Sequence, residues 1–541
     1  MANTGGAIVA PQPRAVEEGI AVLRGGGNAV DAAVATAFMQ AVVDPQMCGV
    51  GGMGTMLIWP AGAPGPRELH FYGRAGSKVT PAMWVDRVRG RTRWWRRFAL
   101  EGYLNDIGYS SIMTPATVAG LYHAHREYGR LRWLEVLAPA VAAAEEGFRV
   151  TSGVAGFWSR EPRESGEVDT RARLHASPEA ARIYFKPDDS MYKEGEVVKN
   201  PDHARSLRVI AEEGPEAFYH GAIARAMAED LERNGAFITA QDLATYRVRT
   251  AAPLQSTYRG YSLYSNVPPG GGITVLQILS ILEGYDVAAL DPLSSEHALL
   301  LARAMQAAFC DRDRWVGDPE FVDVPAADLL SKDHATAWRV HLDAGRPVEF
   351  PAWGAGDGSG TTHVTVVDAE GTIVSLTHTL GSSSGVITPG LGFMYNNSMY
   401  QANPFPQSPN SIAPGKARTS GMCPTIVARD GKPVAALGAP GGNAIITGVL
   451  QALVNVLDHG MTATEAVSAP RIHCEGEAVD LEGRFFRSTV RALEAQGLQA
   501  HWSPVALDGA FARVQLIAID PATGRLDLGP DPRGEGGCGR A

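Results

Sequence analysis

The chain has 541 residues and a mass of 57.4 kDa, enough for about three ordinary domains or one large fused domain. Hydrophobic residues make up 45% and charged residues 20%, a globular composition that excludes disorder as the dominant state. The formal net charge of −10 argues against nucleic acid as a partner, because duplex binding needs a basic surface.

Neither the cysteines nor the N-terminus points to export or to a metal. The five cysteines are scattered and lack the CxxC spacing of zinc sites. The N-terminus has no basic segment followed by an apolar run, and no stretch approaches the ~20 apolar residues that cross a bilayer. We therefore expect a cytoplasmic protein with no metal, no cofactor and no membrane partner.

The first part of the chain alternates helical patterns with short strands. Apolar residues recur at helical spacing over 14–43, and the glycines at 25–27 divide this stretch into two helices, with Asn28 or Asp31 capping the second. Further along, we expect a strand over 55–59, helices over 116–147 and 203–233, a strand over 261–266 and a helix over 273–283.

The glycine-rich stretch 350–360 predicts an exposed flexible loop, after which β-branched residues dominate. Residues 361–368 and 372–379 predict a β-hairpin, and 425–429 and 433–437 predict a second strand pair. A helix is expected over 445–457. This mixture predicts an α/β fold in which helices cover the sheets.

Two sequence features could suggest nucleotide binding. The glycines at 49–54 fit GxGxxG, but a helix precedes them and a strand follows, the inverse of the dinucleotide motif, so a tight helix-to-strand turn is favoured. Arginines at 87–97 surround Trp94 and Trp95. Given the acidic chain, a solvated loop is favoured over base stacking, and a rim that attracts anionic substrates is a third interpretation.

Thr361 stands where the glycine loop enters a strand. If the chain were cut before it, Thr361 would carry a hydroxyl and its own α-amine, and the amine could activate the hydroxyl without a histidine. Before the cut, the same hydroxyl could attack the Gly360 carbonyl and release the chain as an ester. By itself the motif is more often the ordinary start of a strand.

Ten short motifs, read together, resemble the gamma-glutamyltranspeptidase family over about residues 6–485. Each motif is short, but the ordered set is specific. They are GGNAVDAAV at 26–34, GVGGMG at 49–54, YRGY at 258–261, PPGGG at 268–272, DRDRWVGDP at 311–319, TTHVTVVD at 361–368, NN at 396–397, PTIV at 424–427, GAPGG at 438–442 and APRI at 469–472.

The resemblance implies an N-terminal-nucleophile hydrolase with a four-layer αββα sandwich. It also implies a proenzyme that cleaves itself between Gly360 and Thr361 into a large subunit, 1–360, and a small subunit, 361–541, which form the fold jointly. Thr361 would be the nucleophile and general base, and Thr379 would orient its hydroxyl. The backbone amides of Gly441 and Gly442 would form the oxyanion hole.

Three positions depart from the pattern with which the family holds a substrate ammonium group. Gly381 stands where gamma-glutamyl enzymes have an asparagine. Ser398 and Gln401 stand where they have a polar residue and an aspartate, so the carboxylate partner of an ammonium is missing. A buried ammonium without an anion is costly, so an acyl group that lacks an α-amine should fit better.

The carboxylate-binding positions depart as well. Tyr72 replaces the family's arginine, but Arg74, two residues further on, and Ser420, the one survivor of a pair of serines, could still meet a substrate carboxylate. We therefore predict hydrolysis of a small-molecule amide with a carboxylate-bearing acyl group of the oxamate, glutaryl or cephalosporin type. The alternatives are a gamma-glutamyltransferase or glutathione hydrolase proper, and a non-catalytic relative.

Overall fold

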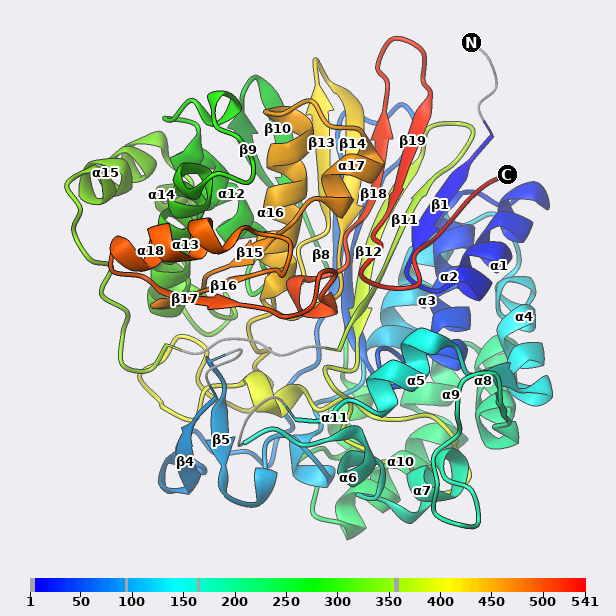
Figure 1. Cartoon of the computed structure of the whole chain (residues 1–541). Coiled ribbons are helices and arrows are strands. Elements are labelled where there is room, and N and C mark those ends of the chain that lie inside the picture. The colour runs from blue at the N-terminus through cyan, green and yellow to red at the C-terminus, as the bar shows by residue number, and fades with distance from the viewer. Residues whose placement is uncertain (1–4, 93–95, 163–165, 355–359) are drawn as a thin grey trace.

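Two antiparallel sheets form the centre of the computed structural model, which describes residues 5–92, 96–162, 166–354 and 360–541 (Figure 1). In those ranges the first sheet runs β20 (Gly537–Arg540), β1 (Ala7–Ala10), β11 (Thr362–Val367), β12 (Ile373–Thr379), β2 (Met53–Trp59), β3 (Arg67–Phe71), β8 (Arg249–Ala251). The second runs β19 (Leu526–Pro530), β18 (Gln515–Ile519), β14 (Lys432–Gly438), β13 (Thr425–Arg429), β10 (Tyr261–Ser265), β9 (Leu254–Tyr258).

Helices cover the outer face of each sheet, as Figure 1 shows. On the first sheet lie α1 (Pro13–Arg24), α2 (Ala29–Val43) and α3 (Thr117–Tyr128). On the second lie α12 (Gly272–Leu282), α16 (Ala444–Leu457) and α17 (Ala463–Ser468). Strands β11 and β12 contact β14 and β18 across the space between the sheets. The α/β prediction is confirmed, and the layers stack as αββα.

The remaining elements surround this sandwich. Helix α4 (Trp133–Glu146) packs on α2, α8 (Pro201–Glu213) on α4, and α13 (Ser295–Trp315) on α12. The others are α5 (Ser152–Trp158), α6 (Thr170–Leu174), α7 (Pro178–Tyr184), α9 (Pro215–Tyr219), α10 (Ala222–Arg233), α11 (Ala240–Ala244), α14 (Ala326–Leu329), α15 (Lys332–Asp343), α18 (Arg487–Ala495), β4 (Val88–Arg91), β5 (Phe98–Leu100), β6 (Phe148–Arg149), β7 (Val197–Val198), β15 (Ile472–His473), β16 (Ala478–Leu481) and β17 (Gln499–Trp502).

Local sequence signals account for α1 and α2. The Asn28 side chain accepts from the backbone N–H groups of Val30 and Asp31, and the Asp31 carboxylate accepts from the Asn28 N–H at 3.0 Å. This capping box begins α2 where the sequence predicted a cap. The helix predicted over 116–147 is instead two, α3 and α4, because the chain turns between them at 129–132.

The β11–β12 hairpin decides where the predicted nucleophile lies. Its register pairs Thr362 with His378 and Val367 with Ile373, which confirms the predicted hairpin. One step beyond the last pair, Thr361 lies across from Thr379. Side chains alternate along a strand, so Thr379 shares the inner face with Ser375 and Thr377, whereas His378 turns outward and contacts Gln40 of α2 at 2.9 Å.

The space between the sheets changes from apolar to polar along the strands. At the β11–β12 turn it is filled by an apolar cluster that includes Val9, Trp59 and Ile373. Further along, His363 Nδ1 lies 2.8 Å from Thr377 Oγ1 and Nε2 lies 3.0 Å from Thr365 Oγ1. Burial lowers the pKa of His363 to about 3, so the ring is neutral. The polar end is therefore where chemistry can occur.

Two segments that the sequence singled out lie partly outside the described residues. Residues 93–95 include Trp94 and Trp95, and residues 355–359 belong to the predicted loop before Gly360. Both interpretations stay predictions. Within the described ranges, no helix is long and apolar enough to cross a membrane.

Glu68 is a fully buried carboxyl between the sheets. Its Oε2 accepts from the Val267 N–H at 2.8 Å and its Oε1 from the Thr55 hydroxyl at 3.4 Å. No cation is among these partners. Burial therefore raises the pKa of Glu68 to about 8, and the folded protein holds it protonated at neutral pH.

We predict that Glu68 makes the protein less stable as the pH rises. Between about pH 4.5 and 8 the folded chain keeps a proton that the unfolded chain has lost, so stability falls by up to ~1.4 kcal/mol per pH unit. Glu68→Gln should flatten this slope in melting temperatures measured from pH 5 to 8, whereas Glu17→Gln on the exposed face of α1 should not. An unchanged slope in Glu68→Gln would contradict the assignment.

Candidate active site

Three oxygens meet at the end of the hairpin. Thr361 Oγ1 lies 3.0 Å from Thr379 Oγ1, and the Thr379 hydroxyl donates to the carbonyl oxygen of Gly360. The Gly381 N–H donates to Thr379 Oγ1 at 2.8 Å. Both threonines are buried. The residue predicted to orient the nucleophile is thus in contact with the nucleophile and with the bond predicted to break.

The direction of these hydrogen bonds follows from counting protons. Thr379 has one hydroxyl proton, and it is directed to the Gly360 oxygen. The Thr361 hydroxyl must then donate to Thr379 in their shared contact. Thr379 thereby polarises the Gly360 carbonyl as an oxyanion donor would, and it holds the neighbouring Thr361 oxygen in place.

Gly360 occupies a position that no larger residue could fill. Its φ of +143° lies in the region that L side chains rarely adopt, and a Cβ there would overlap the Gly381 carbonyl oxygen. The chain therefore approaches the hairpin more closely than a side chain would allow.

The turn that carries Gly441 and Gly442 lies at the same end of the sandwich. Ser375 donates to the Leu437 carbonyl at 3.0 Å, and His363 packs directly on Gly438, so β12 and β14 run toward this end together. After the last residues of β14, the chain forms the Gly441–Gly442 turn and enters α16.

The Gly441 and Gly442 amides are available to a ligand. In the described part of the chain, neither N–H donates to a protein acceptor. They precede the N-terminus of α16, whose dipole favours negative charge. Gly441 has φ +140°, and a Cβ on it would lie 2.8 Å from the Ala512 Cα. These features suit the predicted oxyanion hole, which stays a prediction.

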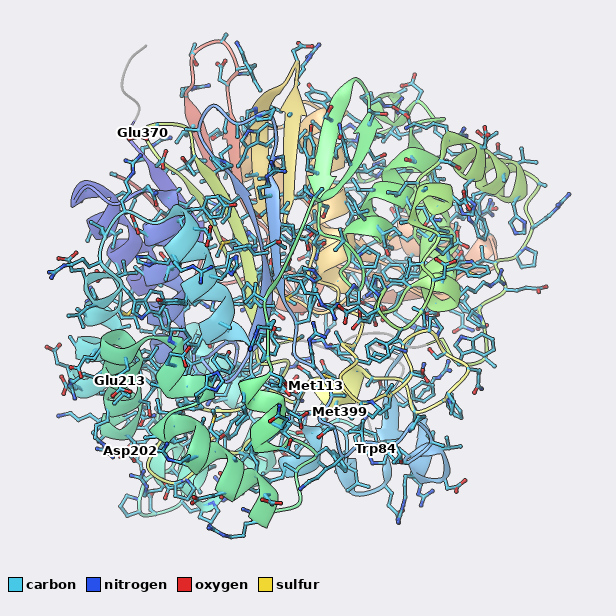
Figure 2. The ribbon with its side chains drawn as sticks, turned by 180° about the vertical axis from the view of Figure 1, so that it is seen from behind. Trp84, Met113, Asp202, Glu213, Glu370 and Met399 are labelled. Carbon is cyan, nitrogen blue, oxygen red and sulfur yellow. The ribbon has the colours of Figure 1, made fainter. Side chains whose placement is uncertain are left out.

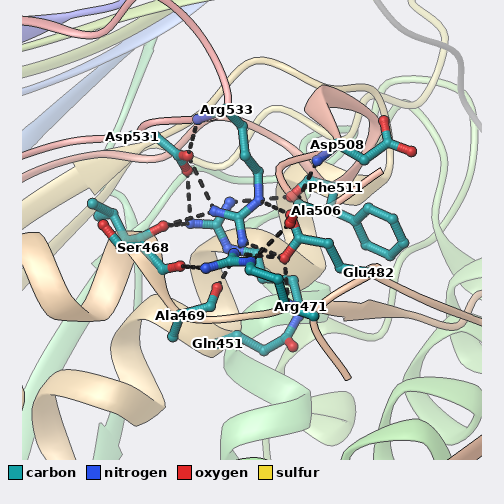
Figure 3. A network of polar contacts seen from close by, with 12 residues as sticks. Gln451, Ser468, Ala469, Arg471, Glu482, Ala506, Asp508, Phe511, Asp531 and Arg533 are labelled. Carbon is teal, nitrogen blue, oxygen red and sulfur yellow. Dashed lines mark hydrogen bonds and ion pairs between the residues drawn. The ribbon is translucent and has the colours of Figure 1, made fainter. Parts of the chain in front are cut away.

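A buried network of four charged residues fixes the segment that packs on Gly441 (Figure 3). Arg471 donates to the carbonyls of Phe511 and Ala512, both at 3.1 Å, and pairs with Asp531 at 2.7 Å. Arg533 pairs with Asp531 at 3.1 Å and with Glu482 at 2.7 Å. Because each buried charge is paired, the network can hold this segment firmly.

Ser420 and Tyr72 meet at a second turn, 268–272. The Ser420 N–H donates to the Pro269 carbonyl at 2.9 Å, and a Cβ on Gly421 would overlap the Gly442 carbonyl oxygen. The Tyr72 hydroxyl accepts from Asn266 Nδ2 at 2.8 Å beside the same turn. Burial raises the pKa of Tyr72 above its usual range. Ser420 thus lies next to the Gly441–Gly442 turn.

The positions of the missing ammonium clamp lie in the segments that follow Thr379 and Asn397. Gly381 has φ +74°, and a Cβ there would overlap Asn397 Oδ1, which accepts from the Ser382 N–H at 2.8 Å. Gln401 Nε2 donates to the Tyr400 hydroxyl at 2.9 Å, and Ser398 contacts the Met53 sulfur at 3.6 Å. An asparagine at position 381 would need this loop to move.

Arg74 is committed to another partner. Its guanidinium lies 3.2 Å from Glu320 Oε2, a carboxylate that Arg249 also contacts. Its backbone bridges to Ala417, three residues before Ser420, but the side chain makes no contact with Ser420 or Thr361 in the described chain. The sequence could not reveal Glu320 as the partner, which lies 246 residues away.

Several residues without a predicted role position the site. Asp106 accepts from Asn397 Nδ2 at 2.8 Å and from Arg173 at 2.9 Å, which secures the loop after Gly381. Arg312 donates to the Ser420 carbonyl at 2.9 Å. Arg312 belongs to the motif at 311–319 and could have been singled out there, whereas Asp106 and Arg173 carry no local signal.

Figure 2 locates the site within the molecule. Glu370 marks the hairpin turn at one end. Met113, Met399 and Trp84, three members of an apolar cluster, lie toward the opposite end. Thr361 and Thr379 stand at the open end of the hairpin, away from its turn. Among the described residues, no three His, Cys, Asp or Glu side chains gather as metal ligands would.

Comparison with known proteins identifies the family. The model of the family described as Gamma-glutamyltranspeptidase matches residues 15–540. The chain belongs to the gamma-glutamyltranspeptidase family. It is 35% identical to the Acylase ACY 1 proenzyme of Pseudomonas sp. (strain V22), over 95% of this chain and 90% of that one. It is 33% identical to the Glutathione hydrolase proenzyme of Escherichia coli (strain K12), over 98% and 90%.

Solved structures of the family share the fold. The crystal structure of cephalosporin acylase from Bacillus halodurans matches with a TM-score of 0.85 and 28% identity, over 99% of this chain and 96% of that one. Helicobacter pylori gamma-glutamyltranspeptidase matches with a TM-score of 0.55 and 31% identity, over 63% and 92%. The chain is thus a member of an enzyme family whose relatives are amide-hydrolysing proenzymes, and the resemblance read from the sequence is confirmed.

Removing the Thr379 hydroxyl should slow self-cleavage. Thr379→Val keeps the shape of the side chain but loses the donor to the Gly360 carbonyl, so we expect cleavage to slow by about 100-fold or more. Thr379→Ser retains the hydroxyl and should cleave much faster than Thr379→Val. Gel densitometry of the freshly translated chain over time measures both rates, and equal rates for the two variants would exclude this role.

Proposed function

We propose that the chain is an autoprocessing N-terminal threonine amidohydrolase, which hydrolyses the amide of a small carboxylate-bearing acyl group through an acyl-enzyme on Thr361. The observation that carries this proposal is the contact between Thr361, Thr379 and the Gly360 carbonyl. A relative that had lost catalysis would have no need to keep this arrangement. The proenzyme relatives support it as well.

Maturation would begin with attack of Thr361 Oγ1 on the Gly360 carbonyl carbon. The hydroxyl proton passes to the amide nitrogen, the C–N bond breaks, and an ester joins Gly360 to the threonine oxygen. Water then hydrolyses the ester, which leaves a carboxylate on Gly360 and a free α-amine on Thr361. The products are subunits 1–360 and 361–541. They would stay together because β1 pairs with both β11 and β20.

Substrate hydrolysis repeats this chemistry with the free α-amine as general base. The amine takes the Thr361 hydroxyl proton as the oxygen attacks the substrate carbonyl, and it returns the proton to the leaving amine. The amides of Gly441 and Gly442 would stabilise the oxyanion, at ~3–4 kcal/mol for one such donor. Water then attacks the acyl-enzyme. These steps use no metal or cofactor. We also propose that the enzyme is located in the cytoplasm.

The acyl group is inferred from what surrounds the threonines. Gly381 offers no side chain to an ammonium, and Gln401 is neutral where a gamma-glutamyl enzyme has an acid. Relatives named acylase support a non-glutamyl acyl group, whereas those named glutathione hydrolase support the alternative. The crowding of Asn397 against Gly381 favours a non-glutamyl acyl group, because it leaves no room at position 381 for the asparagine that would hold an ammonium.

We predict that Thr361→Ala remains one full-length chain, because the attacking oxygen is gone. Thr362→Ala is the matched control. It removes the neighbouring hydroxyl, which points to the opposite face of the sheet and contacts Gln12 and Gln40 at 3.0 and 3.1 Å. On a denaturing gel the control should give two bands. A Thr361→Ala chain that still divides before residue 361 would refute the nucleophile.

We predict that the processed enzyme prefers glutaryl-p-nitroanilide to gamma-glutamyl-p-nitroanilide in kcat/KM. The two substrates differ by one α-ammonium, which finds no anion at Gly381 or Gln401. The difference should be about tenfold or more, as expected when a charged group loses its partner. A tenfold preference for the gamma-glutamyl substrate would instead support the glutathione hydrolase alternative.

A further inference from the structure

A cavity of about 560 Å³ opens beside the Gly441 turn. Segments from both ends of the chain form its walls, which include Asp44, Met47, Phe148, Phe157, Gly441 and Arg513. A volume of this size accommodates a small organic molecule. Of these lining residues, Gly441 alone has a part in the proposed mechanism.

The cavity walls are continuous with the catalytic segments. The Met47 carbonyl accepts from the N–H of Leu380, the residue after Thr379, at 3.1 Å. The Arg513 N–H donates to the Pro440 carbonyl, next to Gly441, also at 3.1 Å. Backbone hydrogen bonds therefore join the cavity walls to the residue after Thr379 and to the residue before Gly441.

Arg513 brings a positive charge to this cavity. The only hydrogen bond of its guanidinium in the described chain joins Nη2 to the Met47 sulfur at 3.9 Å, and the buried Nε has no hydrogen-bond partner. Asp44, Asp531 and Glu535 favour its charge from a distance, but no described carboxylate forms an ion pair with it. Its backbone is held by the network of Figure 3, since the Val514 N–H donates to Asp531 at 2.8 Å.

The neighbouring charges have partners already. Arg533, on the same wall, pairs with Glu482 and Asp531, and Arg14 pairs with Glu17. Glu535, also on the wall, accepts from the Gly153 N–H at 2.6 Å. Asp44 accepts from Gln12 Nε2 at 2.7 Å. Burial raises its pKa to about 6, so it is a weaker counter-charge for Arg513 than an exposed aspartate would be. An anionic ligand would supply what the guanidinium lacks.

We infer that Arg513 binds a carboxylate of the substrate in this cavity, while Met47, Phe148 and Phe157 hold the apolar part of the same group. The inference rests on the proposed amide hydrolysis and names the carboxylate site of that reaction. A guanidinium suits this task because it can donate two parallel hydrogen bonds to a carboxylate. Arg74, by contrast, is already paired with Glu320.

The carboxylate could belong to the acyl half or to the amine half of the amide, and substrates distinguish the two. Glutaryl-p-nitroanilide carries it on the acyl half, the butyryl amide of 3-carboxy-4-nitroaniline carries it on the amine half, and butyryl-p-nitroanilide has none. For each enzyme the measured quantity is kcat/KM of a carboxylated substrate divided by that of the uncharged one.

Arg513→Gln should lower this ratio about tenfold or more for one carboxylated substrate, which identifies the half that enters the cavity. Arg513→Lys, which keeps the charge but loses the bidentate geometry, should lower it less. The matched control is Arg429→Gln, an exposed arginine of β13 that contacts Tyr261. Its ratios should equal those of the wild type. Unchanged ratios in both Arg513 variants would overturn the inference.

A binding measurement separates this inference from the proposed function. Calorimetric titration of the protein with glutarate and with 3-carboxy-4-nitroaniline needs no turnover. The wild type should bind one of them about tenfold more tightly than Arg513→Gln does. If Arg513→Gln loses this affinity in a protein that hydrolyses none of the amides, the carboxylate site is supported and the proposed reaction is refuted. If Arg513→Gln does not fold, the same comparison is made with Arg513→Lys, and equal affinity there refutes the site.

Discussion

The register of one β-hairpin is the constraint on which the site depends. Because β11 and β12 pair as they do, Thr361 and Thr379 face each other on the inner side of the sheet, and the Thr379 hydroxyl donates to the Gly360 carbonyl. A slip of one residue would turn Thr379 toward the helices and replace it with His378 or Leu380. The apolar cluster at the hairpin turn opposes that slip, because the slip would move Ile373 from the apolar space between the sheets to the opposite face of its own sheet.

The Gly441 turn and the cavity beside it depend on segments that lie far apart in the chain. Arg471, Glu482, Asp531 and Arg533 form a buried set of ion pairs that holds Ala512 against Gly441. The same segment presents Arg513 to the neighbouring cavity. One network thus supports two proposed tasks, oxyanion stabilisation and carboxylate binding. The hairpin supplies the nucleophile, and the network supplies the groups that would surround the substrate.

The sequence predicted what local patterns determine. The cap at Asn28, the hairpin after Gly360 and the helix after Gly442 follow from side-chain periodicity and from turn residues, and all three are present. It could not predict that Arg74 would pair with Glu320 or that Arg513 would form no ion pair with a described carboxylate. Those outcomes depend on contacts between residues hundreds of positions apart, which local sequence periodicity does not predict. The family resemblance supplied the site residues but not their partners.

Intact mass spectrometry of the purified wild-type protein tests the central claim most directly. If the hairpin register places Thr361 to attack Gly360, the protein consists of two polypeptides, residues 1–360 and residues 361–541, and the smaller one begins with a free amine on Thr361. A single chain of 57.4 kDa, or a small subunit that begins at any other residue, would contradict the account.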